Sequence, residues 1–158
     1  MGSGLDLASH AGEPVLLLRL LFAALAGAAI GWNRFRNGKP AGVGTHALVA
    51  LGAALFVAIP VQTSLPQSGD SLSRVIQGVA TGVGFLGAGE IFRDQGGTGR
   101  VHGLTSAAAL WVTAALGIVA VCGSWVIIAS TTTFVMLILV LAPRLERRFA
   151  LRDGENRR

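Results

Sequence analysis

A series of apolar runs, each long enough to cross a bilayer, limits the possible folds of this 158-residue chain. A transmembrane helix needs about 20 mainly apolar residues, and residues 14–142 contain five such runs separated by short polar joints. With 52% hydrophobic residues, 13% charged residues and a mean hydropathy of +0.62, the chain lacks the composition of a soluble domain. The sequence therefore predicts an all-α integral membrane protein, a bundle of about five transmembrane helices.

The transmembrane domain is expected at 14–142, between a flexible leader at 1–13 and a basic tail at 143–158. Its helices are predicted at 14–32, 45–61, 74–93, 103–121 and 125–142. The last two follow each other closely, but at a rise of about 1.5 Å per residue the whole stretch is too long for one crossing. Gly123 and Ser124 are the best place for a turn. One crossing with a tilted extension is the alternative.

The basic residues of the joints predict the orientation in the membrane. Cytoplasmic joints carry an excess of Lys and Arg, and here the basic residues fall in alternate joints and in the tail. They are Arg34, Arg36, Lys39, Arg93, Arg100, Arg144, Arg147, Arg148, Arg152, Arg157 and Arg158. The joint at 62–73 carries none before Arg74, and neither does the Gly123-Ser124 turn. We therefore expect a multi-pass protein of a bacterial inner membrane, with its N-terminus outside and its C-terminus in the cytoplasm.

The charge pattern and the types of side chain exclude several function classes. The net charge of +5 comes from residues beside helix ends, which indicates contact with a lipid bilayer and not with nucleic acid. Cys122 is the one cysteine and is interpreted as a small apolar filler. We find no nucleophile–base pair, metal cluster or phosphate-binding loop. The sequence thus predicts no catalytic residues, no cofactor and no metal site, and the chain is not expected to be an enzyme.

Glycines concentrate in the first and third predicted helices. They are Gly27, Gly31, Gly78, Gly82, Gly84, Gly87 and Gly89. Residues 82–87 match a dinucleotide-binding GxGxxG pattern, but that pattern requires a strand-to-helix turn and a following acidic residue, which are missing here. In lipid, glycines let helix backbones approach each other closely. We therefore expect them to pack the first helix against the third, within one chain or across a dimer.

Ionisable residues inside a membrane are candidates for function. Glu90 lies about one turn from the cytoplasmic end of the third helix. It could form a structural pair with Arg93 or with a basic residue of the first joint, or it could bind a proton or cation. Arg19 lies close enough to the outer surface to extend toward it, or to meet Glu13 or Asp70. A structural use is favoured for Arg19.

A polar set gathers where the cytoplasmic joints meet the membrane, and it forms the candidate functional cluster together with Glu90. Its members are Asn33, Arg34, Lys39, Thr45, His46, Glu90, Arg93, His102 and Thr105. Thr45 and Thr105 are predicted to cap the second and fourth helices. His46 and His102 could titrate or bind an anion, although solvated positions at helix ends are favoured for both.

Several long motifs in this chain resemble those of the MgtC/SapB family of bacterial inner-membrane proteins. The first comprises 31–42 (GWNRFRNGKPAG), then Thr45-His46 and 51–56 (LGAALF). The others are 81–89 (TGVGFLGAG) and 103–115 (GLTSAAALWVTAA). The resemblance covers about residues 15–125, and motifs of this length and order are highly specific. Many relatives carry an ACT-like domain after the membrane part, and this chain resembles the membrane-only branch.

The chain departs from the family pattern at charged positions. Family members usually have Glu where this chain has Asn33, and Arg where it has Gly44. At Glu90, where the family usually has an apolar residue, the chain could supply a compensating carboxylate near Arg34. We therefore predict that Glu90, Arg34 and Arg93 form one charge cluster on the cytoplasmic side of a contact between the first and third helices.

The resemblance implies a role in magnesium homeostasis, in adaptation to low magnesium and, in pathogens, in virulence. It also implies a membrane-protein partner such as the ATP synthase. The leading hypothesis is a small regulatory membrane protein that acts through helix contacts, with itself as a homodimer or other homo-oligomer, or with such a partner. The alternative is a cation or proton transporter or channel that uses Glu90.

Overall fold

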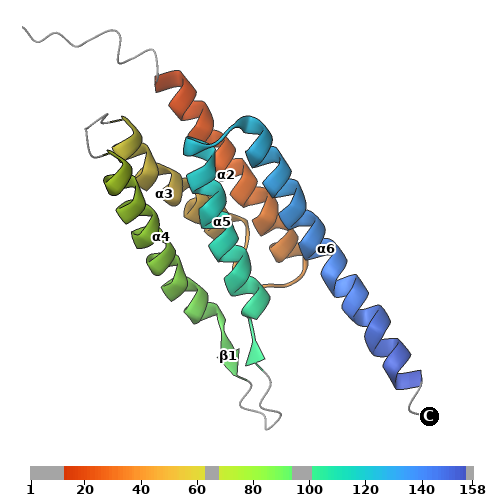
Figure 1. Cartoon of the computed structure of the whole chain (residues 1–158). Helices are drawn as coiled ribbons and strands as arrows, with labels where there is room; N and C mark the ends of the chain where they lie inside the picture. Colours follow the sequence, from red (N-terminus) through yellow and green to blue (C-terminus); the bar gives the residue numbers. More distant parts are fainter. Residues whose placement is uncertain (1–12, 63–67, 94–100, 156–158) are drawn as a thin grey trace, which may run out of the picture.

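The structure is a computed structural model, and it describes residues 13–62, 68–93 and 101–155. This part of the chain is an all-α bundle (Figure 1). Its helices are α2 (Glu13–Arg36), α3 (Val43–Gln62), α4 (Ser68–Glu90), α5 (Leu104–Cys122) and α6 (Trp125–Glu155). Consecutive helices run in opposite directions (Figure 1). A short antiparallel hairpin between α4 and α5 consists of β1 (Phe92–Arg93) and β2 (Val101–His102).

The outer surface of the bundle is apolar, as a membrane protein requires. Large side chains such as Phe85, Val126 and Leu48 are 70–80% exposed, which water would penalise and lipid does not. Four described helices, α2, α3, α5 and α6, are long and apolar enough to cross a bilayer. The first turns of α4 are more polar, but its 23 residues lie antiparallel beside α3 and α5 (Figure 1). The predicted all-α membrane bundle is therefore confirmed.

The helix boundaries differ from the predicted ones mainly in α4 and α6. The turn at Gly123-Ser124 is confirmed, since α5 ends just before it and α6 begins just after it. However, α4 begins at Ser68, six residues earlier than predicted, and ends at Glu90 because the chain then enters the hairpin. Helix α6 continues through Pro143 into the predicted tail. The predicted flexible leader lies outside the described residues, except that Glu13 begins α2.

We call the end of the bundle that carries Arg36, Lys39 and His102 the basic end. Helix α2 stops there because Gly38 adopts a left-handed conformation with φ 65°, while Gly38 and Lys39 donate backbone hydrogen bonds to the last carbonyls of α2. Gly103 is also left-handed, with φ 89°, and precedes α5. A Cβ atom at Gly103 would collide with the carbonyl oxygen of Glu90, so the chain between α4 and α5 closes tightly only with glycine at this position.

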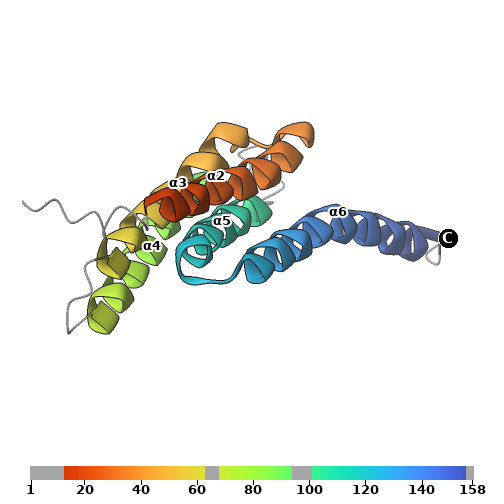
Figure 2. The same ribbon diagram turned by 90° about the horizontal axis from the view of Figure 1, so that it is seen from above.

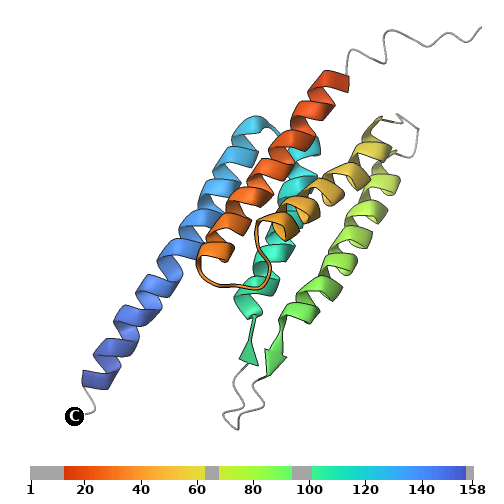
Figure 3. The ribbon, with the colours of Figure 1, turned by 180° about the vertical axis from the view of Figure 1, so that it is seen from behind.

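Helices α3 and α5 form the centre of the bundle, with α2 packed against both of them and α4 packed against both from another side. Many of the buried residues are small, for example Ala23, Ala54 and Ala120, which lets the backbones lie close together. Helix α6 lies at the edge of the bundle, on the side away from α4 (Figures 2 and 3). Only 6% of its most apolar segment is buried, against 50% for that of α5.

Arg19 joins α2 to the end of α5 that is remote from the basic end. Its Nη1 atom donates hydrogen bonds to the carbonyl oxygens of Ala120, Val121 and Gly123 at 2.8, 3.1 and 2.9 Å. Carbonyls at a helix C-terminus lack intrahelical donors and carry partial negative charge, so a guanidinium is a suitable cap. The guanidinium also lies 5.0 Å from the ring centroid of Trp125. The structural role predicted for Arg19 is therefore confirmed.

Candidate functional site

A buried polar group occupies the interior of the bundle near the basic end. It contains one residue from each of four helices, Arg34 of α2, His46 of α3, Glu90 of α4 and Ser106 of α5, and we call this set the polar centre. Arg34, His46 and Ser106 are 4%, 0% and 2% exposed, and Glu90 is partly buried. Polar groups this deep in a membrane helix bundle are costly, so their arrangement requires an explanation.

Arg34 connects α2 to α5. Its Nη2 atom donates a hydrogen bond of 2.6 Å to Ser106 Oγ. Arg34 Nε is buried and has no hydrogen-bond partner among the described residues. Because a guanidinium offers five N–H donors in a fixed plane, Arg34 retains the capacity to bind a further acceptor.

His46 lies on the inner face of α3, three residues after its start. Its Nδ1 atom lies 3.0 Å from the carbonyl oxygen of Gly42. Since a carbonyl can only accept, Nδ1 carries the proton in this bond, and the neutral ring then presents Nε2 as an acceptor. Nε2 is buried and has no hydrogen-bond partner in the described part of the chain. The solvated position predicted for His46 is therefore wrong, because α3 begins at Val43 and turns this side chain inward.

Glu90 supplies the negative charge of the polar centre. It is the last residue of α4, and its charge interacts electrostatically with both Arg34 and His46. Its Oε2 atom is buried and, within the described ranges, has no hydrogen-bond partner. The compensating carboxylate near Arg34 that the sequence suggested is thus present, supplied by α4 and not by the residue next to Arg34 in the chain.

The polar centre can take part in proton or small-ligand chemistry more readily than in metal binding. Its unpartnered atoms comprise one donor, Arg34 Nε, and two acceptors, His46 Nε2 and Glu90 Oε2. Leaving such atoms unpaired costs about 1–3 kcal/mol each, so a small polar molecule or a shared proton would be stabilised here. A divalent cation prefers several oxygen ligands, and the guanidinium of Arg34 would repel it. The described residues contain no group of three or more His, Cys, Asp or Glu residues that could hold a metal ion.

The other members of the predicted cluster whose side chains are described are not part of the polar centre. Asn33 is partly exposed, and Lys39, Thr45, His102 and Thr105 are exposed. The predicted threonine caps are wrong. Thr45 lies two residues inside α3, and the N-cap of α5 is Gly103, which makes no side-chain cap.

Arg93 lies on β1, three residues beyond Glu90, which ends α4. A helical pair between Arg93 and Glu90 is therefore excluded, because α4 does not extend to Arg93. Of the predicted charge cluster, Glu90 and Arg34 interact electrostatically, but Glu90 Oε2 and Arg34 Nε make no hydrogen bond within the described residues. The predicted contact between their helices is wrong, because α2 and α4 both pack mainly against α3 and α5. The side chain of Arg93 lies outside the described residues.

Ser106 is the member of the polar centre that the sequence analysis does not single out. It begins a buried face of α5 that continues through Ala109, Leu110, Thr113 and Gly117, at the 3.6-residue period of a helix. The signal was a spacing of seven residues between two hydroxyl side chains, Ser106 and Thr113. It was hidden because nearly every other residue of α5 is also small or apolar.

The glycines divide between two environments. A Cβ atom at Gly27 would collide with the carbonyl oxygen of His46, and one at Gly31 would lie 2.7 Å from the carbonyl oxygen of Gly42. Both glycines therefore bring α2 against the start of α3, and the predicted contact of these glycines with the third helix of the same chain is wrong. A Cβ atom at Gly87 would lie 3.4 Å from that of Ala107 in α5. Open space surrounds the position of an added Cβ at the remaining predicted glycines, which are Gly78, Gly82, Gly84 and Gly89.

Comparison with known proteins identifies the family. The MgtC family matches residues 20–148. Protein SrpB of Synechococcus elongatus is 49% identical over 150 residues, which cover 90% of this chain and 82% of SrpB. Putative magnesium transporter YhiD of Escherichia coli K12 is 45% identical over 109 residues, covering 65% of this chain and 49% of YhiD. Protein MgtC of Salmonella typhimurium LT2 is 36% identical over 145 residues, covering 89% of this chain and 60% of MgtC.

The chain thus spans most of SrpB, 60% of MgtC and about half of YhiD. No solved structure matches it. The family match extends from the first half of α2 to the part of α6 beyond Pro143, and so includes every residue of the polar centre. From this coverage and from its apolar helices, we conclude that the chain is a membrane protein that belongs to the MgtC family.

Proposed function

We propose that this chain is a small regulatory protein of the bacterial inner membrane that acts in magnesium homeostasis through contacts between helices. The link to magnesium rests on the family and on its relative YhiD, which is described as a putative magnesium transporter. The regulatory role rests on one observation in particular. Most of the glycines of α4 have open space where a side chain would stand, so no helix of the same chain packs against them. Glycine permits close helix contact in lipid, and these glycines are therefore available for contact with a helix of another chain.

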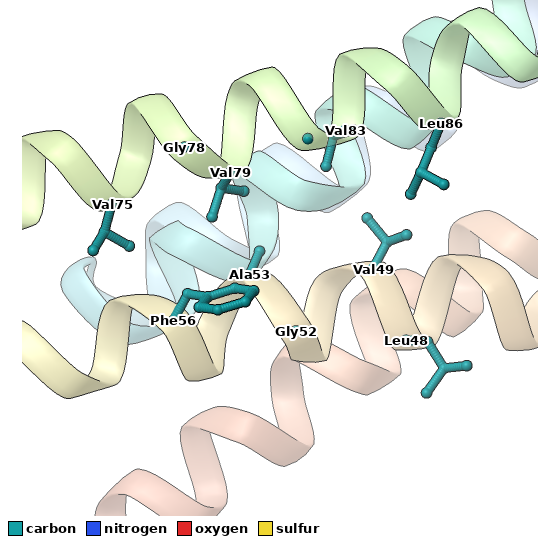
Figure 4. A pocket seen from close by; sticks show the side chains of 11 residues that line it. Leu48, Val49, Gly52, Ala53, Phe56, Val75, Gly78, Val79, Val83 and Leu86 are labelled. Atoms are coloured by element: carbon teal, nitrogen blue, oxygen red, sulfur yellow. The ribbon is translucent and has the colours of Figure 1, made fainter.

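An apolar groove between α3 and α4 provides a surface for such a contact. Its volume is about 570 Å³, and Gly78 and Gly82 of α4 and Gly52 of α3 line it. Figure 4 shows Val79 and Val83 of α4 directed toward α3 across the groove. A helix of a second copy, or of another membrane protein, could lie there with its backbone close to these glycines. We expect a homodimer or other homo-oligomer as the first such assembly.

The polar centre favours a regulatory role and not ion transport. Glu90 is the intramembrane carboxylate singled out in the sequence, and its charge interacts with the guanidinium of Arg34. A cation that approached Glu90 would have to compete with Arg34, which holds a fixed positive charge within electrostatic range of Glu90. The polar centre is therefore better suited to stabilising one arrangement of four helices than to passing a cation.

Assembly provides the test of the regulatory proposal. We expect Gly82→Leu to fold normally but to reduce oligomer size in detergent and to abolish complementation of growth at low magnesium. Gly84→Leu is the matched control, because Gly84 lies on the same helix with the same open surroundings but does not line the groove. Equal assembly and equal growth for Gly82→Leu, Gly84→Leu and the unchanged protein would contradict the proposal.

A proton or cation transporter is the second candidate function, favoured by the buried and unpartnered Glu90 Oε2 and His46 Nε2 atoms. Purified protein in liposomes separates the two candidates. The regulatory proposal predicts no flux of Mg²⁺ or protons above that of empty liposomes, with no change on Glu90→Gln. Flux that is present in the unchanged protein and lost in Glu90→Gln would favour the transporter.

The orientation in the inner membrane is tested separately. Reporter fusions at Gln67 and Arg152 should read outside and inside, respectively, because the basic joints are retained in the cytoplasm. The same location at both positions would contradict the five-crossing arrangement with the N-terminus outside.

A further inference from the structure

A groove between α2 and α6 adjoins a basic pocket at the basic end. The groove has a volume of about 940 Å³ and is apolar along its length. Its lining residues on α2 extend from Leu18 to Ala29, and those on α6 extend from Trp125 to Val140. Its two threonines on α6 donate their hydroxyl hydrogens to carbonyls of their own helix. The groove therefore offers a ligand almost only hydrocarbon contacts.

The pocket at the end of this groove has the opposite chemistry. It has a volume of about 390 Å³, and its polar and basic lining consists of Asn33, Arg36, Asn37 and Arg144. The apolar residues Leu139, Val140 and Pro143 complete the lining. Two arginines and two asparagines face one space, and none of these lining residues is acidic. Val140 lines both the pocket and the groove, so the two lie next to each other along α6.

We infer that this composite surface is a binding site for one anionic phospholipid, with its phosphate at Arg36 and Arg144 and an acyl chain in the groove. Arginine binds phosphate oxygens through paired N–H donors, and basic pockets between transmembrane helices recognise anionic headgroups. The eleven-residue separation of Leu18 from Ala29 corresponds to about 16 Å along α2. That length is about half of a roughly 30 Å hydrocarbon core, as one acyl chain requires.

Charge decides between a lipid and the other possible occupants. A second copy of the chain related by a two-fold axis would bring its own Arg36 and Arg144 toward the same positive pocket, which is unfavourable. A free phosphate would use the pocket but leave the groove unfilled. An anionic phospholipid complements both parts.

The full chain in detergent, titrated with phosphatidylglycerol and with phosphatidylcholine of the same acyl chains, tests this site by native mass spectrometry. We expect tighter binding of phosphatidylglycerol and a loss of that affinity of roughly fivefold per arginine, or about 25-fold in the double variant Arg36→Gln/Arg144→Gln. Lys39→Gln/Arg148→Gln removes the same charge from exposed positions outside the pocket and should retain the affinity. Ala129→Phe, which fills the groove, should weaken binding of both lipids.

Three outcomes would overturn the inference. An equal loss in both double variants would indicate general surface charge. Binding of inorganic phosphate with the same dependence on Arg36 and Arg144, but with no effect of Ala129→Phe, would indicate a free-anion site. A change of oligomer size in Ala129→Phe without a change in lipid binding would indicate a second copy in the groove. Circular dichroism and gel filtration of each variant would show that the loss of binding is not a loss of fold.

Discussion

Helices α2 and α4 are both rich in glycine, yet their glycines do different things. In α2, Gly27 and Gly31 lie so close to the backbone at the start of α3 that a single added carbon would collide with it. In α4, Gly78 and Gly82 have open space where that carbon would be placed. The same residue type therefore closes an internal contact in one helix and leaves a smooth, accessible surface on the other.

The physical reason is that lipid supplies no hydrophobic force to drive helices together, so packing and polar contacts decide which ones associate. The contact of α2 with α3 lies beside the polar centre, where Arg34 and His46 are buried on these two helices. Helix α4 brings one polar residue to that centre, Glu90, at its last position. A small residue thus permits a close contact, while a nearby polar group selects its partner.

The largest effect is expected at Gly27. We predict that Gly27→Leu destabilises the protein by about 4 kcal/mol or more, above the usual 1–3 kcal/mol for overpacking, because the first added carbon meets backbone and not a flexible side chain. The free energy of unfolding in detergent is the measurement, and Gly84→Leu is the control with no expected loss. A Gly27→Leu variant as stable as this control would show that the α2–α3 contact can separate at no cost.

The second prediction concerns the charges of the polar centre. Arg34→Gln should destabilise the protein by about 3 kcal/mol, because Glu90 loses its counter-charge and Ser106 loses its donor. Glu90→Gln should also destabilise it, by a smaller amount, since Glu90 is only partly buried. The double variant should recover part of the summed loss, because coupled residues deviate from additivity. Strictly additive losses would show that the two charges act separately.

The third prediction concerns the Arg19 cap at the opposite end. Arg19→Gln should cost about 2 kcal/mol, since it removes the charged donor to carbonyls at the end of α5 and the contact with Trp125. Arg19→Lys should recover part of this, because a lysine retains the charge but not the planar arrangement of donors. Unfolding in detergent measures both variants. Equal stability of Arg19→Gln and the unchanged protein would remove Arg19 from the set of stabilising contacts.

The smallest effects are expected along α4. Gly87→Leu should cost about 1–2 kcal/mol, because Ala107 stands 3.4 Å from the added carbon and must shift. In the monomeric protein, Gly82→Leu should change the free energy of unfolding by less than about 0.5 kcal/mol, since open space surrounds Gly82 within the chain. Both variants could also be measured at concentrations where the protein is oligomeric. A loss of about 2 kcal/mol or more in the free energy of unfolding only at those concentrations would show that the glycines of α4 stabilise an assembled state. The glycines of α2 would then make contacts within the chain, and those of α4 would make contacts between chains.

The candidate site could be predicted in part. Arg34, His46 and Glu90 were identified because polar residues within membrane helices are rare and therefore conspicuous. The sequence does not single out Ser106, and it predicts caps at the neighbouring Thr105 and at Thr45. The reason is the same for both errors: a shift of one or two residues in the start of a helix changes which side chain faces inward. The short hairpin was missed because it contains only two residues in each strand.

The amino-acid sequence was sufficient to establish a bundle of apolar helices and to locate most of their boundaries. A backbone in lipid must satisfy its own hydrogen bonds, so each long apolar run has essentially one solution. Which face of each helix points inward, in contrast, depended on how the helices pack together. Helices such as α3 and α5 are small or apolar on nearly all sides, so periodicity could not place His46 in the interior or direct Gly27 to α3. Those positions follow from close packing and from the pairing of Arg34 with Ser106, which only the folded bundle brings together.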